Sequence, residues 1–189
     1  ARALTFKLAE SLRVTSITSP ELGRLLGMRV VGQTGIIVNV PQALQAHRPT
    51  VLVTQHGCDS HRHDPLADLN LTLDGQRASY LALAKLADEL CSGRWVSTGG
   101  GGYSVLNVVP RAWTHLLGIV SGEPVEPTTP VPEAWRTAIG ESAPLTMSDG
   151  APATFRPFEE GFAPHSRVDQ AILATRQAVF PELGIDPSL

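Results

Sequence analysis

The stretch IIVNVPQALQAHRPTVLVT, residues 36–54, decides the fold class. Its two ends, residues 36–40 and 50–54, are continuous apolar runs rich in β-branched residues, and the segment from Pro41 to His47 between them has the character of a helix. Unbroken apolar strands that alternate with a helix are typical of a parallel sheet, because helices then cover both faces of the sheet. We therefore predict an α/β fold in which a parallel sheet is flanked by helices.

The alternation continues toward the C-terminus. Residues 72–90 keep apolar side chains at helical spacing, with Asp74 in the first turn and Gly93 after the end, and lead to a short predicted strand at 95–97. A further helix is predicted to open near Asn107, with Pro110 in its first turn, and to stop before Gly122. Its predicted buried stripe consists of Ala112, His115, Leu116 and Ile119.

The two ends of the chain are less regular. Leu4, Leu8 and Leu12 recur at a spacing typical of a short amphipathic helix. Prolines recur between residues 122 and 165, so we expect regular structure there only near 133–139. Ser166 is predicted to cap a last helix that runs to residue 180, with Asp169 completing a capping box.

The composition excludes several classes of protein. The chain has 189 residues, of which 42% are hydrophobic and 17% charged, and its formal net charge is -3, as expected for a soluble globular domain. It has no apolar run of about 18 residues that would span a membrane, and no basic excess that would bind nucleic acid directly. Two cysteines are too few for a disulfide framework, and the first residues lack an uncharged apolar signal segment. We expect a cytoplasmic protein.

The first segment that carries chemistry directly follows the strand predicted at 50–54. Residues 56–64 hold two carboxylates and three histidines, which are donors that suit a zinc-like cation. Groups beyond the carboxyl ends of parallel strands gather in a crevice, so Asp59 is well placed for such a site. Two alternatives remain: a polar loop in which Asp64 only makes a turn before Pro65, and a metal cluster of Asp59 with His61 and His63.

The second segment is the glycine run 99–102, followed by Tyr103. It follows the next predicted strand and leaves backbone groups uncovered, so the chain can approach a ligand closely while Tyr103 presents a phenol. The run lacks the Gly-Lys-Ser/Thr of a phosphate-binding loop and the spacing of a dinucleotide fingerprint. The alternative is a flexible turn.

Together the two segments resemble a known family. The phrases 57–60 (GCDS), 64–66 (DPL), 71–72 (LT) with Gly75, and 99–103 (GGGGY) with Asn107 and 111–113 (RAW) resemble the C-terminal half of the zinc-dependent histone deacetylase superfamily. The phrase 109–113 (VPRAW) looks most like its bacterial acetoin utilization branch. The resemblance is strongest over residues 50–122.

The resemblance implies an arginase-like α/β fold and a zinc-dependent amide hydrolase that removes acetyl groups from acetyl-lysine or a small acetylated amine. It implies that Asp59 is a zinc ligand and that the Tyr103 hydroxyl binds the substrate carbonyl and the oxyanion formed from it. Gly100, Gly101 and Gly102 would border the acyl group. Residues 1–122 would then belong to the deacetylase-like domain, 123–165 would be a proline-rich irregular segment, and 166–189 a C-terminal helix and tail.

The chain departs from the family pattern in its catalytic histidines. The family uses two adjacent histidines and an upstream Asp-x-His segment, but this sequence has no adjacent pair, and its one Asp-x-His, residues 59–61, occupies the position of the later aspartate. We expect the chain to correspond to a deacetylase domain without its N-terminal catalytic half, inactive alone, and partnered by that missing portion or by itself. The competing hypothesis is a non-catalytic remnant that acts as a structural or interaction module.

Overall fold

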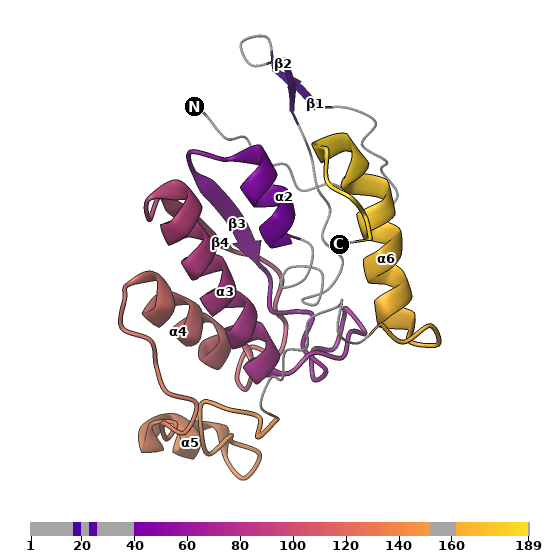
Figure 1. Cartoon of the computed structure of the whole chain (residues 1–189). Coiled ribbons are helices and arrows are strands. Elements are labelled where there is room, and N and C mark those ends of the chain that lie inside the picture. The colour runs from indigo at the N-terminus through magenta and orange to yellow at the C-terminus, as the bar shows by residue number, and fades with distance from the viewer. Residues whose placement is uncertain (1–16, 20–22, 26–39, 152–161, 189) are drawn as a thin grey trace.

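The computed structural model describes residues 17–19, 23–25, 40–151 and 162–188 (Figure 1). The helix predicted at residues 4–12 and most of the strand predicted at 36–40 lie outside these ranges. The last residue of that strand does not: Val40 is the first residue of helix α2 (Val40–His47). The strand prediction is therefore wrong at Val40, where the backbone is helical and the side chain is buried.

A two-stranded parallel sheet forms the centre of the described structure. Strand β3 (Leu52–His56) pairs with β4 (Trp95–Gly99), in register from Leu52 opposite Trp95 to His56 opposite Gly99. The predicted parallel pairing is confirmed, but β3 begins two residues later than predicted, and β4 ends two residues later. Polar residues such as Gln55 and Thr98 continue the ladder because their backbone groups pair regardless of side-chain polarity.

Helix α3 (Leu73–Cys91) connects the two strands and lies against them (Figure 1). As predicted, Asp74 lies in its first turn, and the Thr72 hydroxyl caps it by accepting a hydrogen bond from the Gly75 N–H at 3.1 Å. The helix ends where Ser92 and Gly93 adopt left-handed backbone angles, with φ of 52° and 74°. A crossover of this length is what joins parallel neighbours, which cannot be linked by a hairpin.

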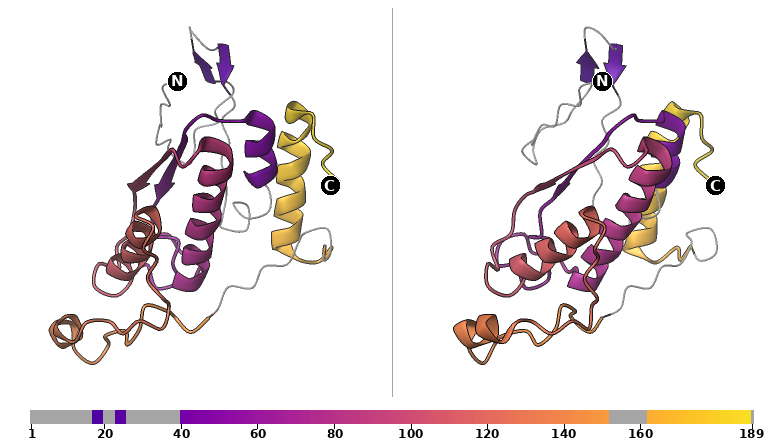
Figure 2. Two further views of the ribbon diagram at one scale, coloured as in Figure 1. Left: turned by 60° about the vertical axis from the view of Figure 1, so that its left-hand side comes forward. Right: turned by 90° about the vertical axis from the view of Figure 1, so that its left-hand side faces the viewer.

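Helix α4 (Val109–Val120) packs on α3 (Figure 2), with Pro110 in its first turn. Its buried residues include the four predicted from the sequence, Ala112, His115, Leu116 and Ile119. Leu52 of β3 and Trp95 of β4 face this helical layer, where they contact side chains of α2, α3 and α4. Residues of the opposite pleat, Gln55, Val96 and Thr98, are exposed, so the helices named here cover one face of the sheet and the predicted cover of the second face is not observed in the described residues.

The remaining elements lie at the two ends of the chain. Helix α5 (Glu133–Ile139) matches the predicted short piece, and α6 (Arg167–Val179) is followed by a 3-10 turn, η2 (Pro181–Leu183). The Ser166 hydroxyl caps α6 by accepting from the Asp169 N–H, while the Asp169 carboxylate accepts from the Ala163 N–H. Strands β1 (Ile17–Ser19) and β2 (Gly23–Leu25) form an antiparallel pair. Within the ranges given above, none of the helices combines the length and the apolar character that crossing a membrane requires.

Candidate functional site at the carboxyl ends of strands β3 and β4

The loops that follow β3 and β4 lie in direct contact, because the strands are parallel neighbours and end at the same edge. The Cys58 N–H donates to the Gly101 carbonyl with an N···O distance of 2.7 Å, which extends the pairing of the strands into the loops. The sequence predicted that Asp59 and the glycines 100–102 belong to one site, and the structure brings these segments together.

The three glycines allow this close approach. A Cβ atom on Gly101 would overlap the Asp59 carboxylate, and one on Gly100 would lie 2.8 Å from the Cα of Gly57. A Cβ on Gly102 would lie 2.6 Å from the Cys58 sulfur. The glycine run is therefore a packing requirement of the loop that carries Asp59, and not only a flexible turn.

Tyr103 stands at the end of the glycine run with its side chain 48% exposed. Its backbone N–H donates to Asp64 Oδ2 at 2.8 Å, and the other oxygen of that carboxylate accepts from the Leu66 N–H at 2.9 Å. Desolvation alone would raise the pKa of Asp64, but hydrogen bonds from the N–H groups of Leu66, Tyr103, Ala67 and Ser104 outweigh it and lower the pKa. Asp64 thus makes the turn before Pro65 and also joins it to the second loop.

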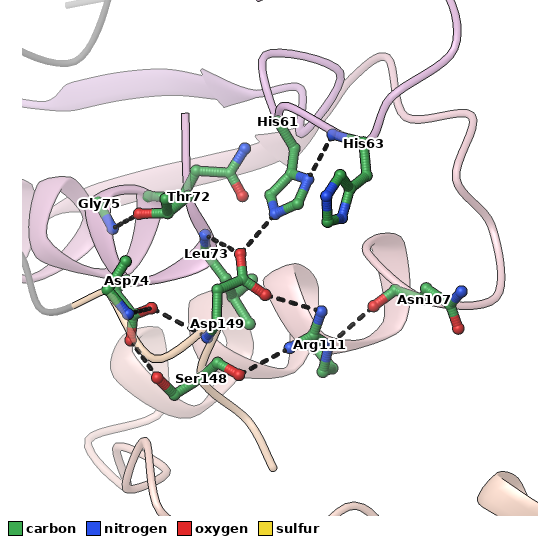
Figure 3. A network of polar contacts seen from close by, with 12 residues as sticks. His61, His63, Thr72, Leu73, Asp74, Gly75, Asn107, Arg111, Ser148 and Asp149 are labelled. Carbon is green, nitrogen blue, oxygen red and sulfur yellow. Dashed lines mark hydrogen bonds and ion pairs between the residues drawn. The ribbon is translucent and has the colours of Figure 1, made fainter. Parts of the chain in front are cut away.

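His61 is completely buried and uses both ring nitrogens (Figure 3). Nδ1 accepts a hydrogen bond from the His63 N–H at 3.0 Å, and Nε2 lies 2.6 Å from Asp149 Oδ2. An Nδ1 that accepts is unprotonated, so the ring proton is on Nε2 and is donated to Asp149. Neither nitrogen is free for a metal ion, which removes His61 from the predicted alternative cluster.

Asp149 is the residue that sequence reasoning missed. Its carboxylate accepts from His61, from the Leu73 N–H at 2.9 Å and from Arg111 Nη2 at 3.0 Å (Figure 3). Burial alone would raise its pKa, but these donors and the Arg111 charge hold the pKa well below its ordinary value. No local pattern signals the residue, because His61 is 88 positions away along the chain.

His56, another of the predicted donors, lies away from the loops. Its ring contacts the rings of Tyr80 and Trp95 edge-on in the helical layer, and Nε2 is 2.6 Å from the Thr54 hydroxyl. Burial lowers the pKa of His56 to about 4, so the ring is neutral at pH 7. It is a satisfied core histidine and not a metal ligand.

The donor set of the described residues does not fit a complete zinc site. Zinc in proteins takes three or four side-chain ligands. Among the described residues, no three or more His, Cys, Asp or Glu side chains are grouped so that they could hold a metal ion. Of the predicted donors, His56 and His61 are committed to the core, and Asp59 remains as a single carboxylate at the junction of the loops.

Comparison with known proteins supports one family. Residues 35–120 match the histone deacetylase domain, a segment that contains β3, α3, β4, α4 and both loops. This segment is therefore similar in sequence to the histone deacetylase domain. The chain is 32% identical over 99 residues to the acetoin utilization protein AcuC of Bacillus subtilis (strain 168), and 35% identical over 109 residues to the protein of the same name from Staphylococcus xylosus.

These relatives are much longer than the matched segment. The alignments cover 52% and 57% of this chain but only 25% and 28% of the two AcuC proteins, so the chain spans about a quarter of their length. Among solved structures, an HDA15 HD domain aligns over 49% of this chain and 25% of its own, with 24% identity and a TM-score of 0.40. Asp149 lies beyond the matched residues.

Proposed function

We propose that this chain contributes the loops of β3 and β4 to a zinc-dependent deacetylase that hydrolyses the amide bond of acetyl-lysine or of a small acetylated amine. The observation that carries the proposal is the packing of Gly101 against the Asp59 carboxylate, with Tyr103 at the end of the same loop. This junction lies at the carboxyl ends of parallel strands, where α/β proteins bind ligands, and inside the histone deacetylase match.

In this proposal, Tyr103 acts on the reacting carbonyl. Its phenol is exposed, and its backbone is anchored by Asp64, so the hydroxyl can donate to a substrate oxygen from a fixed loop. The carbonyl oxygen becomes an anion only when the amide carbon turns tetrahedral, and a donor already in position stabilises that charge without reorganisation. The glycines 100–102 would border the acyl group, because they present backbone rather than side chains.

Asp59 would be one ligand of the zinc ion. Zinc supplies a Lewis acid and an activated water in hydrolases of this type. The described residues offer a single suitable carboxylate, and the sequence holds neither the adjacent histidine pair nor the upstream Asp-x-His segment of the family. We therefore propose that the other ligands and the proton-transfer groups come from polypeptide outside these 189 residues. On this basis we expect the 189-residue chain to have no deacetylase activity by itself.

A second candidate is a non-catalytic structural or interaction module. The observation that favours it is the commitment of His56 and His61 to buried contacts, which leaves no group of metal ligands among the described residues. The two candidates differ in the metal content of the polypeptide that completes the site: about one zinc per molecule retained after dialysis favours the deacetylase, and none favours the module.

The decisive experiment replaces each of the two tyrosines of the chain by phenylalanine, one at a time. Tyr103→Phe, tested in the polypeptide that completes the site, should lower kcat on an acetyl-lysine peptide by about 10²–10³ with little change in KM. Tyr80→Phe is the matched control, since Tyr80 is buried in the core and its hydroxyl has no hydrogen-bond partner among the described residues. A change in KM alone for Tyr103→Phe would assign the phenol to substrate binding instead.

A further inference from the structure

The Asp64 carboxylate joins the two loops of the site. One oxygen accepts from the Leu66 N–H and the other from the Tyr103 N–H, at 2.9 and 2.8 Å, and the N–H groups of Ala67 and Ser104 also point to this carboxylate. Two donors thus come from its own turn and two from the loop after the glycine run. Hydrogen bonds to an ionised acceptor are about twice as strong as neutral ones, so this carboxylate is the strongest described link at Tyr103.

Tyr103 needs such an anchor. The glycines 100–102 before it are packed against the first loop, but the side chain of Tyr103 itself is 48% exposed. Contacts of the ring therefore supply little constraint on where the phenol lies. The backbone of Tyr103 sets the origin of its side chain, and Asp64 holds that backbone.

Asp64 is itself fixed through His61. The Asp64 N–H donates to the His61 carbonyl at 2.9 Å, and the buried His61 ring is held between the His63 N–H and Asp149. The same loop is tied to the start of α3, where the Leu71 N–H donates to the Ser60 carbonyl at 3.1 Å. The turn that carries Asp64 is therefore held by hydrogen bonds to buried groups.

Asp149 ends the segment 146–149, which hydrogen-bonds to Asp74 of α3 and to Arg111 of α4 (Figure 3). Arg111 Nη1 donates to the carbonyls of Thr146 and Ser148, at 3.3 and 3.1 Å. The Asp74 carboxylate accepts from the Ser148 hydroxyl at 2.7 Å and from the Asp149 N–H at 2.9 Å. Because these hydrogen bonds fix the segment, the Asp149 carboxylate has a defined position next to the His61 ring.

We propose that Asp64 is a positioning residue for the Tyr103 phenol, and that Asp149 holds Asp64 in place through His61. The catalytic consequence rests on the function proposed above; the positioning itself is a property of this chain. An oxyanion donor works only when it lies about 2.7–3.1 Å from the developing charge, so a loop that drifts by an ångström loses much of its effect.

The first test is amide hydrogen exchange measured by NMR on the ¹⁵N-labelled 189-residue chain. Asp64→Asn replaces one accepting oxygen by an NH₂ group, which cannot accept a hydrogen bond from a backbone N–H. The Tyr103 amide should therefore exchange about 10- to 100-fold faster than in the wild type. Asp149→Asn should speed the same amide by a smaller factor, and it serves as the second variant if Asp64→Asn does not fold. An unchanged Tyr103 amide in both variants overturns the proposal.

Two controls separate positioning from general loss of structure. Asp88→Asn removes an exposed charge from α3, and Leu83→Ala opens a cavity in the core cluster under β3. Both should leave Tyr103 amide exchange within about twofold of the wild type, since local opening of the loop does not require the core to unfold. Faster Tyr103 exchange in Leu83→Ala, equal to that in Asp64→Asn, would contradict a specific role for Asp64.

The second test is a double-mutant cycle in the polypeptide that completes the site. Asp64→Asn should lower kcat at least about 10-fold with KM within about twofold, and should add little to Tyr103→Phe, because one change displaces the donor that the other removes. Full additivity overturns the link between the residues. If Tyr103→Phe leaves kcat unchanged, the proposed function fails, while the exchange experiment still decides whether Asp64 positions Tyr103.

Discussion

The buried ring of His56 predicts a specific pH dependence of stability. Burial lowers its pKa from 6.5 to about 4 in the folded protein, whereas the unfolded chain keeps the ordinary value. Between these two pH values the unfolded state binds more protons, so the free energy of unfolding rises with pH. The contribution is complete above pH 6.5, is lost progressively as the pH falls from 6.5 to about 4, and changes little below that.

The magnitude follows from the shift. Each pKa unit corresponds to about 1.4 kcal/mol, so His56 should remove about 3 kcal/mol of stability between pH 7 and pH 4. The ring is 6% exposed, so solvent screens little of this effect. His115, whose pKa burial also lowers, acts with the same sign. Asp64 and Asp149, whose pKa values are held low, lose their contributions as the pH falls below about 3.8.

The assay is urea unfolding followed by tryptophan fluorescence at several pH values from 7.5 to 4.5, because Trp95 lies against the His56 ring. His56→Phe keeps an aromatic ring next to Tyr80 and Trp95 but cannot titrate. We expect the stability of this variant to fall less than that of the wild type over this range, by about 2–3 kcal/mol. Parallel curves for the two proteins would refute the reasoning.

Three further predictions follow from the structure. Gly101→Ala places a Cβ where the Asp59 carboxylate lies, so we expect a loss of about 1–3 kcal/mol in the free energy of unfolding by urea titration; an unchanged midpoint would mean that the loops are farther apart than described. Cys58 and Cys91 are both buried, and burial raises the pKa of the Cys58 thiol to about 11, so both should resist a thiol reagent at pH 8 until urea is added. The chain should associate in size-exclusion chromatography with light scattering, because Val96 is 49% exposed on the open face of the sheet, and Val96→Lys should reduce that association; a monomeric wild type would contradict this prediction.

The amino-acid pattern was enough to predict helices α3 and α4 and the two loops that carry the candidate site. Helices α3 and α4 follow from apolar spacing, capping residues and proline placement, all of which act within one or two turns. The approach of Asp59 to Gly101 was predictable because both follow parallel strands, whose carboxyl ends share one edge. The resemblance to the histone deacetylase family added the roles assigned to Asp59 and Tyr103.

Which polar residues serve the core was settled by contacts between segments that lie far apart in the sequence. His56, Asp59 and His61 lie within six residues of one another, and nothing in the local sequence separates their roles. In the fold, the His56 ring packs against aromatic rings, and the His61 ring pairs with the Asp149 carboxylate. Asp149 reaches His61 across 88 positions, and Arg111 reaches Asp149 across 38. Such contacts leave no periodicity in the chain, because they depend on how helices and loops pack and on the need of every buried charge for a partner.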